Sequence, residues 1–504
     1  MAGRFTDDVE IEGTGTMSRG TKLRRQGAFM GTFVGMIGEG IALPAALVTA
    51  AVLTRGLGPE GYGRFTVAAT VVTTLEWILV AVFAKVVIKF VAEAEDWHPV
   101  AATAFRTYVF AGTFLGGVLW LAAGGIAAAL SDPLLAGHLR LFALEIPLFT
   151  AAMACRNVLA GLGGYRQQAV AGAARWLGRM VLIVVFIQLG WAVQGAILGS
   201  IGGVLLGFLV GQAFIGRPTF GAAEFPYRRL VQLAVPAFLL LLTVRLFDRV
   251  ALLVLNALQG AGPEVGFYGA AQNLSMVTGV VAMTVTPILI STVGAARRAS
   301  NEERAREIAG GALRAALASL PFAGIVAGSS EEIFRLLFGA GFAAAAPLGE
   351  WMAFVAVGLV IISVATSLLI AHGRLWGTLW LTMPLLPLSV LGHFVLIPRY
   401  GALGAAMVTT VTAFAGATIC VVNAHRVWQV RAPFGTLLRS LGFCLAAYWL
   451  AAAWPAPGVL VVGKAAVLSV AVVAAFLLSG ELSRDEIAGL RNWWNTRAQR
   501  AAAR

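Results

Sequence analysis

The chain has 504 residues, of which 59% are hydrophobic and only 12% are charged, and its mean hydropathy is +0.84. An ordinary soluble protein carries about 25% charged residues, so this composition excludes a soluble domain and indicates that the lipid bilayer is the solvent. The net charge of +13 is explained by basic loops that face an anionic lipid surface, and nucleic-acid binding is not indicated.

Apolar runs long enough to cross a bilayer follow one another with short polar breaks. They predict an all-α polytopic membrane protein with about 14 transmembrane helices. The first eight lie near residues 29–53, 63–91, 103–130, 137–162, 167–189, 191–213, 229–257 and 265–292. The other six lie near residues 306–328, 344–371, 375–397, 402–424, 434–454 and 457–479.

Positive charges are distributed unevenly over the loops. If alternate loops face opposite sides, most of the 37 Lys and Arg residues fall on one side; the other side carries Arg55, Arg64, Arg140, Arg335, Arg399 and Lys464. The positive-inside rule then places both termini in the cytoplasm. The stretch 481–504 predicts an amphipathic helix on the membrane surface, with a disordered basic tail as the alternative.

Three landmarks occur twice in the same order and at nearly one offset. They are residues 58–63 and 262–269, residues 159–163 and 369–373, and residues 190–196 and 399–405. Because six spans, an even number, separate the copies, the pattern predicts two six-helix halves of the same orientation, with two further helices outside the repeat. Within the sixth span, Gly199, Gly203, Gly207 and Gly211 predict close packing against a neighbouring helix.

The segment Leu53–Gly63, with Gly58, Pro59, Glu60, Gly61, Tyr62 and Gly63, resembles the signature after the first helix of O-antigen and polysaccharide flippases of the MOP exporter superfamily. Residues 371–374 and 398–406 are similar to that family's landmarks around its tenth to twelfth helices. The resemblance covers about residues 28 to 425. The spans, the charge bias and the repeat predict a cytoplasmic tail (1–28), an N-lobe (29–215), a C-lobe (228–425), two added helices (433–480) and a cytoplasmic tail (481–504).

The resemblance also implies a function. The expected cargo is an oligosaccharide linked to undecaprenyl diphosphate, which a central cavity would carry from the cytoplasmic to the outer leaflet of a bacterial inner membrane for assembly of a surface polymer such as lipopolysaccharide. Expected partners are membrane lipids and polysaccharide polymerase machinery, and a monomer is the expected state. No cofactor or metal is expected, and coupling to H⁺ or Na⁺ is left open.

Ionisable and polar residues within the spans are candidates for lining the cavity. A charged side chain in the membrane is energetically costly, so its presence there indicates a function. The candidates are Glu39, Glu76, Arg245, Asp248, Arg249, Asn256, Gln272 and Asn273. The two arginines would hold the diphosphate by bidentate hydrogen bonds; alternatively, these charges form an ion-pair network that braces the lobes. Lys85 and Lys89 reach the headgroups, or attract anionic lipid at the cavity mouth. Glu145, Arg156, Arg175 and Arg179 fall in spans that the family places further from the lobe interface, and they are expected to be structural or interfacial.

Two other functions are considered. A cation-coupled multidrug or small-molecule exporter would share the fold, since fold does not set cargo. A membrane polymerase or ligase would need catalytic groups on a sizeable outer loop. The outer acidic pair Glu331 and Glu332, beside Arg335, is interpreted as part of a solvated loop. The protein is therefore not expected to be an enzyme.

Overall fold

The computed structural model of the protein describes residues 42–94, 96–216, 249–260, 262–273, 300–372, 383–429 and 434–480, and a few residues between 289 and 297. In this part of the chain the regular elements are all helices, and nine of them are long and apolar enough to cross a membrane. The all-α, multi-pass membrane fold is thus confirmed. The expected tails, 1–28 and 481–504, lie outside the described residues.

The N-terminal half forms one bundle. Its helices are α2 (Ala42–Glu93), α3 (His98–Ala129), α4 (Leu135–Ala143), α5 (Glu145–Gly161), α6 (Tyr165–Gln188) and α7 (Ala192–Ile215). The predicted turn between the first two spans is a bend inside α2, where Gly58 has φ +66° and ψ 178°. Pro59 follows it, and its fixed φ suits the first turn of the next helical stretch.

The described part of the C-terminal half starts with helical residues Arg249–Gln259 and 263–273. It continues with α10 (Glu302–Leu317), α11 (Leu320–Gly328), α12 (Ser330–Phe338), the 3₁₀ helix η1 (Ala340–Ala345), α13 (Ala346–Ala371) and α15 (Leu385–Trp428). A bend at Gly401 divides α15, as Gly58 divides α2. The two added helices, α16 (Phe434–Ala453) and α17 (Leu460–Leu478), pack on α11.

The internal repeat is visible in the backbone. The third landmark places Ala192 and Gly401 at matching positions, and both have left-handed angles, φ +44° and +59°. Each stands at the start of a helical stretch, at the beginning of α7 and of the second part of α15. The same turn therefore introduces the last helix of each half.

The glycines of the sixth span pack as expected. A Cβ on Gly203 would lie 2.6 Å from the Cα of Arg179, and one on Gly199 would lie 2.7 Å from the nitrogen of Ile183. Only residues without a side chain allow α6 and α7 to approach this closely.

The fourth predicted span is not one continuous helix. The chain forms α4 up to Ala143, turns at Leu144, and resumes as α5 at Glu145. Pro147 explains the interruption, because it has no N–H to donate to the carbonyl of Ala143, four residues earlier. The break places the carboxyl group of Glu145 at the start of a helix inside the membrane.

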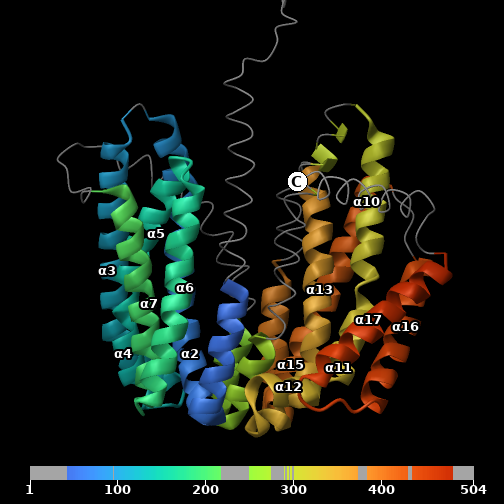
Figure 1. The fold of residues 1–504 in the computed structure, drawn as a ribbon. Helices are drawn as coiled ribbons and strands as arrows, with labels where there is room; N and C mark the ends of the chain where they lie inside the picture. The colour runs from blue at the N-terminus through green and yellow to red at the C-terminus, as the bar shows by residue number, and fades with distance from the viewer. Residues whose placement is uncertain are drawn as a thin grey trace, which may run out of the picture.

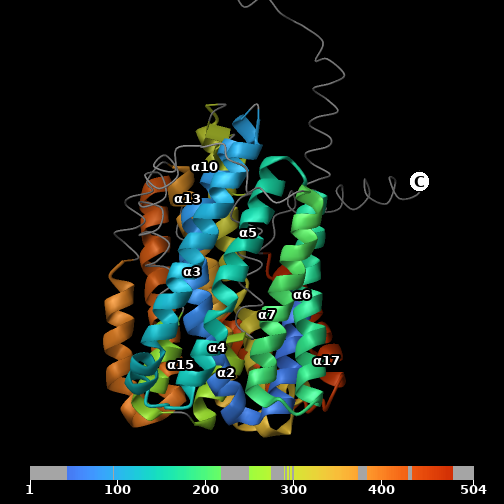
Figure 2. The same ribbon diagram turned by 90° about the vertical axis from the view of Figure 1, so that its left-hand side faces the viewer.

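In the described part of the chain, the two bundles approach each other at one end. In Figure 1 they meet at the bottom, where α2 and α12 lie, and their helices diverge towards the top. Seen from the side of α3 to α7, the helices of both bundles run along the same long axis (Figure 2). Among the described residues, the contacts between the two halves therefore lie at this shared end.

Candidate functional site

The two copies of the Gly-Pro-Glu motif touch each other where the bundles meet. A Cβ on Gly266 would lie 2.0 Å from the carbonyl oxygen of Pro59, and one on Gly63 would lie 2.8 Å from the nitrogen of Gly266. The backbones are in contact, with no room for any side chain. We call residues 55–66, 130–134, 256–260, 262–273 and 336–342 the lobe contact.

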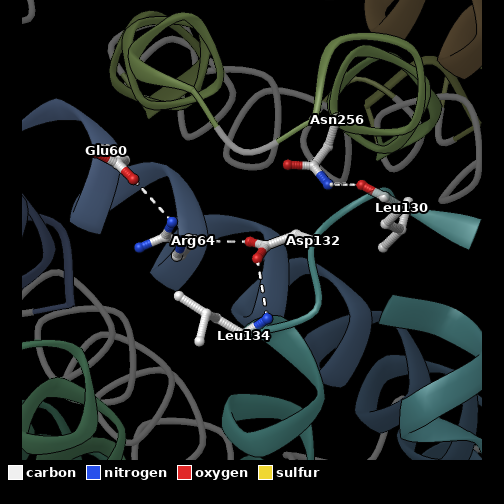
Figure 3. A network of polar contacts seen from close by, with 6 residues as sticks. All are labelled: Glu60, Arg64, Leu130, Asp132, Leu134 and Asn256. Carbon is white, nitrogen blue, oxygen red and sulfur yellow. Dashed lines mark hydrogen bonds and ion pairs between the residues drawn. The ribbon is translucent and has the colours of Figure 1, made fainter. Parts of the chain in front are cut away.

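A polar network spans the lobe contact (Figure 3). Arg64 forms an ion pair with Glu60 at 2.7 Å and with Asp132 at 3.3 Å. Asp132, which is buried, also accepts a hydrogen bond from the nitrogen of Leu134 at 3.2 Å. These contacts fix the turn between α3 and α4 against α2.

The turn between α3 and α4 also contacts the C-terminal half. The amide nitrogen of Asn256 donates to the carbonyl oxygen of Leu130 at 2.7 Å, and Asn256 is only 1% exposed (Figure 3). Beside it, the hydroxyl of Ser131 donates to the carbonyl of Ala257 at 3.3 Å. An unpaired polar group that is buried away from water costs free energy. The hydrogen bond of Asn256 therefore stabilises the joined state, in which the two halves are in contact.

Tyr62 is the aromatic centre of the same contact. Its ring stands edge-on to Phe342 at 5.7 Å, and its hydroxyl accepts a hydrogen bond from the amide of Asn273 at 2.6 Å. Phe267 meets the same Phe342 ring at 5.6 Å. Arg55 adds a polar contact, since its guanidinium group donates a hydrogen bond to the carbonyl oxygen of Leu336 at 2.6 Å. The sequence motif is thus where the halves join, as well as a turn.

The two copies of the motif glutamate have different partners. Glu60 pairs with Arg64, whereas Glu264 accepts a hydrogen bond from the nitrogen of Ala402 at 2.7 Å, just after the bend at Gly401. Free N–H groups at a helix start attract a carboxylate. The repeat therefore conserves the turn but not the role of its charge.

The structure places some of the predicted cavity residues and not others. Glu39, Arg245 and Asp248 lie outside the described residues, and so do the side chains of Lys85 and Lys89 on α2. Arg249 is half-buried on the helical stretch Arg249–Gln259; Asn256, two turns on, belongs to the lobe contact together with Asn273, and Gln272 is buried beside Asn273. A substrate-binding role for any of them stays a prediction.

Glu76 lies among charges that the sequence predicts to be structural or interfacial. On α2 it is 3% exposed, and the charges that act on it belong to Glu145, Arg175 and Arg179 from α5 and α6. All four are members of the N-terminal bundle. The sequence carries a signal for this cluster, because these four ionisable residues all lie inside apolar spans of the N-terminal half.

The acidic pair Glu331 and Glu332 is not in a loop. Glu331 and Glu332 open α12, and Glu331 pairs with Arg335 at 2.7 Å. Glu332 pairs instead with the buried ammonium group of Lys464 on α17 and accepts from the nitrogen of Ala456 at 2.8 Å. A cavity of about 940 Å³ opens beside this pair. The interpretation as a solvated loop was wrong, because Lys464 needs an anionic partner in an apolar helix.

Comparisons with known proteins agree with this architecture. A family model described as "Polysaccharide biosynthesis protein" matches residues 28–292. No curated protein matches the chain. Among solved structures, a lipid II flippase, MurJ, in an inward closed conformation has a TM-score of 0.69 at 11% identity, covering 90% of this chain and 100% of its own.

Transporters of the MATE family of the MOP superfamily are also similar. An inward-facing multidrug resistance transporter has a TM-score of 0.61 at 16% identity, covering 79% of this chain and 100% of its own. An outward-facing one has a TM-score of 0.55 at 16% identity, covering 83% and 100%. At these identities the likeness concerns the fold.

Proposed function

Since the chain belongs to the polysaccharide biosynthesis protein family, we propose that it flips an oligosaccharide linked to undecaprenyl diphosphate from the cytoplasmic to the outer leaflet. One observation carries the mechanism: two similar bundles that are joined at one end through two copies of one motif. Breaking that contact and forming another at the opposite end would move a central site from one leaflet to the other.

The charge bias assigns the sides. The lobe contact and its surroundings carry Arg55, Arg64 and Arg335, three of the few cations expected outside, so the joined end faces outwards. The bundles then diverge towards the cytoplasm, where the cargo is made.

Arg249 is the described residue that suits the diphosphate. It lies seven residues before Asn256 on one helix, which at 1.5 Å per residue puts it about 10 Å from the lobe contact towards mid-membrane. A guanidinium group binds phosphate oxygens with two parallel hydrogen bonds. Arg245, one turn further, would extend the same stripe.

The test is a leaflet-resolved flipping assay in proteoliposomes with a fluorescent undecaprenyl-diphosphate oligosaccharide. Wild type is expected to flip it, and Arg249→Ala to slow it at least tenfold. The matched control is Arg304→Ala, which removes an exposed arginine paired with Glu307 on α10. Wild-type inactivity towards several lipid-linked glycans, with export of small cations instead, would favour the multidrug exporter; unchanged flipping by Arg249→Ala would make that arginine structural.

A further inference from the structure

A cavity of about 940 Å³ opens between the C-terminal half and the two added helices. Its walls are the ends of α11 and α16, parts of α12 and η1, the start of α13 and the connection between α16 and α17. Small-molecule sites in proteins measure about 300–1,000 Å³, so the cavity is large enough for a ligand. α12 lies at the joined end of the bundles (Figure 1), which the proposed orientation places on the outer side of the membrane.

Hydrogen bonds and close packing fix the walls of this cavity. The buried ammonium group of Lys464 donates to the carbonyl oxygen of Trp454 at 2.9 Å and forms an ion pair with Glu332. These contacts join the connection between α16 and α17 to α12. Further along α11 and α16, a Cβ on Gly324 would lie 2.5 Å from the carbonyl oxygen of Cys444, so the two helices are in backbone contact. A cavity with such walls is formed before a ligand arrives, and binding costs little conformational entropy.

The charges of the lining exclude some ligands. Glu331 pairs with Arg335 at 2.7 Å. Glu332 pairs with Lys464, so two of the three lining carboxylates already have a cation as partner. The remaining excess is the single negative charge of Glu350, which gives little attraction for a polycation. A phosphate group would be repelled by the three carboxylates, which excludes the diphosphate of the carrier and phospholipid headgroups.

The groups that remain suit the hydroxyl groups and the apolar face of a sugar ring. The carboxylate of half-buried Glu350 accepts a hydrogen bond from the hydroxyl of Tyr448 at 3.3 Å. A carboxylate has about four lone-pair sites, so it can accept further hydrogen bonds from a ligand. The other lining residues are mostly Ala, Gly and Pro, which leave room for a ring and offer apolar surface to its C–H groups.

We propose that this cavity binds a neutral sugar unit on the outer side of the membrane and that its occupancy stabilises the joined state of the two halves. That the sugar belongs to the delivered cargo rests on the proposed function. The central path carries the lipid-linked glycan outwards, and the sugar units that reach the outer side then hold the joined end closed against their return.

α12 and η1 connect the cavity to the lobe contact, because the same short stretch of chain serves both. The carbonyl oxygen of Leu336 accepts a hydrogen bond from Arg55 at 2.6 Å. The ring of Phe342 stands edge-on to that of Tyr62 at 5.7 Å. The residue before Leu336 and the residue after Phe342 both line the cavity. A ligand favours the conformation in which its site is formed, and the structure with the lobe contact contains this cavity, so binding is expected to raise the fraction of joined molecules.

Saturation-transfer NMR of the full chain in nanodiscs measures sugar binding without any lipid carrier. The probes are free neutral trisaccharides built from glucose, galactose, mannose, rhamnose or N-acetylglucosamine, with spermidine and inorganic phosphate as charged alternatives. Transfer to at least one trisaccharide is expected in the wild type. Ala452→Trp, which places a large ring at an exposed lining position, and Glu350→Gln are each expected to reduce it by at least about fivefold. The matched control is Ala453→Trp, because this neighbouring residue of α16 is also exposed but lies outside the lining, so it should bind like the wild type.

Spin labels at the exposed Leu134 and Tyr400 then report the distance between the halves. The trisaccharide that binds is expected to raise the ratio of joined to separated molecules by about threefold or more in the wild type and in Ala453→Trp, and to leave it unchanged in Ala452→Trp. No transfer to any trisaccharide, equal transfer in Ala452→Trp, or binding without a change in distance would overturn the proposal, and so would transfer to spermidine or phosphate alone. A failure of flipping, with both measurements as expected, would refute only the proposed function.

Discussion

Replacing Gly266 by alanine tests whether the lobe contact belongs to one state of a transport cycle. The added Cβ would stand 2.0 Å from the carbonyl oxygen of Pro59 and 2.8 Å from its carbonyl carbon. Both atoms are backbone, so no side chain can rotate away. The two halves must separate here or distort.

The magnitude follows from overpacking, which costs about 1–3 kcal/mol in a close-packed site. If only the joined state contains this contact, the whole penalty falls on that state. The ratio of separated to joined molecules then rises about 5- to 150-fold. Thermal stability is expected to fall less, because the separated state escapes the clash.

The assay measures distances by pulsed electron resonance between labels at Leu134→Cys and Tyr400→Cys, both exposed positions, after replacement of the three buried native cysteines. Gly262→Ala is the matched control, since a Cβ there meets nothing within 4 Å. The population of long distances should grow in Gly266→Ala and stay at the wild-type level in Gly262→Ala. Identical distributions in two well-folded variants would refute a state-dependent contact.

Three further substitutions test the packing. Asn256→Ala leaves the carbonyl of Leu130 unpaired at the lobe contact, which costs the joined state about 1–3 kcal/mol. The same spin labels should then show a larger population of long distances. The control Asn423→Ala loses a hydrogen bond to Ile419 within its own helix and should leave the distances unchanged. Lys464→Met leaves the carboxylate of Glu332 without its ion-pair partner, which should destabilise the protein by about 3–5 kcal/mol and lower its unfolding temperature. Adding Glu332→Gln should restore most of that stability. If the single and the double variant unfold at the same lowered temperature, the ion pair is not the cause. Gly203→Ala should destabilise by about 1–3 kcal/mol through contact with Arg179, whereas Gly117→Ala, in open space, should melt like the wild type.

The membrane fold and its internal repeat could be predicted from the sequence alone. Helical spans follow from apolar runs of sufficient length, because in lipid each backbone polar group must be satisfied within its own helix. The bends at Gly58 and Gly401 were marked by turn residues, and the glycine stripe of α7 by its spacing. These features depend on local sequence, so they could be predicted without knowledge of neighbours.

The partners of the charges depended on packing. Nothing in the order of residues showed that Lys464 would meet Glu332, or that Glu76 would lie among the charges of Glu145, Arg175 and Arg179. The break before Glu145 carried a local mark, Pro147, but apolar length alone predicted a continuous helix. The contact of the two motif copies likewise exists only because the halves are folded against each other. Hydropathy tells which segments enter the membrane, whereas the rotation and tilt of each helix, which decide what a buried charge touches, are set by its neighbours.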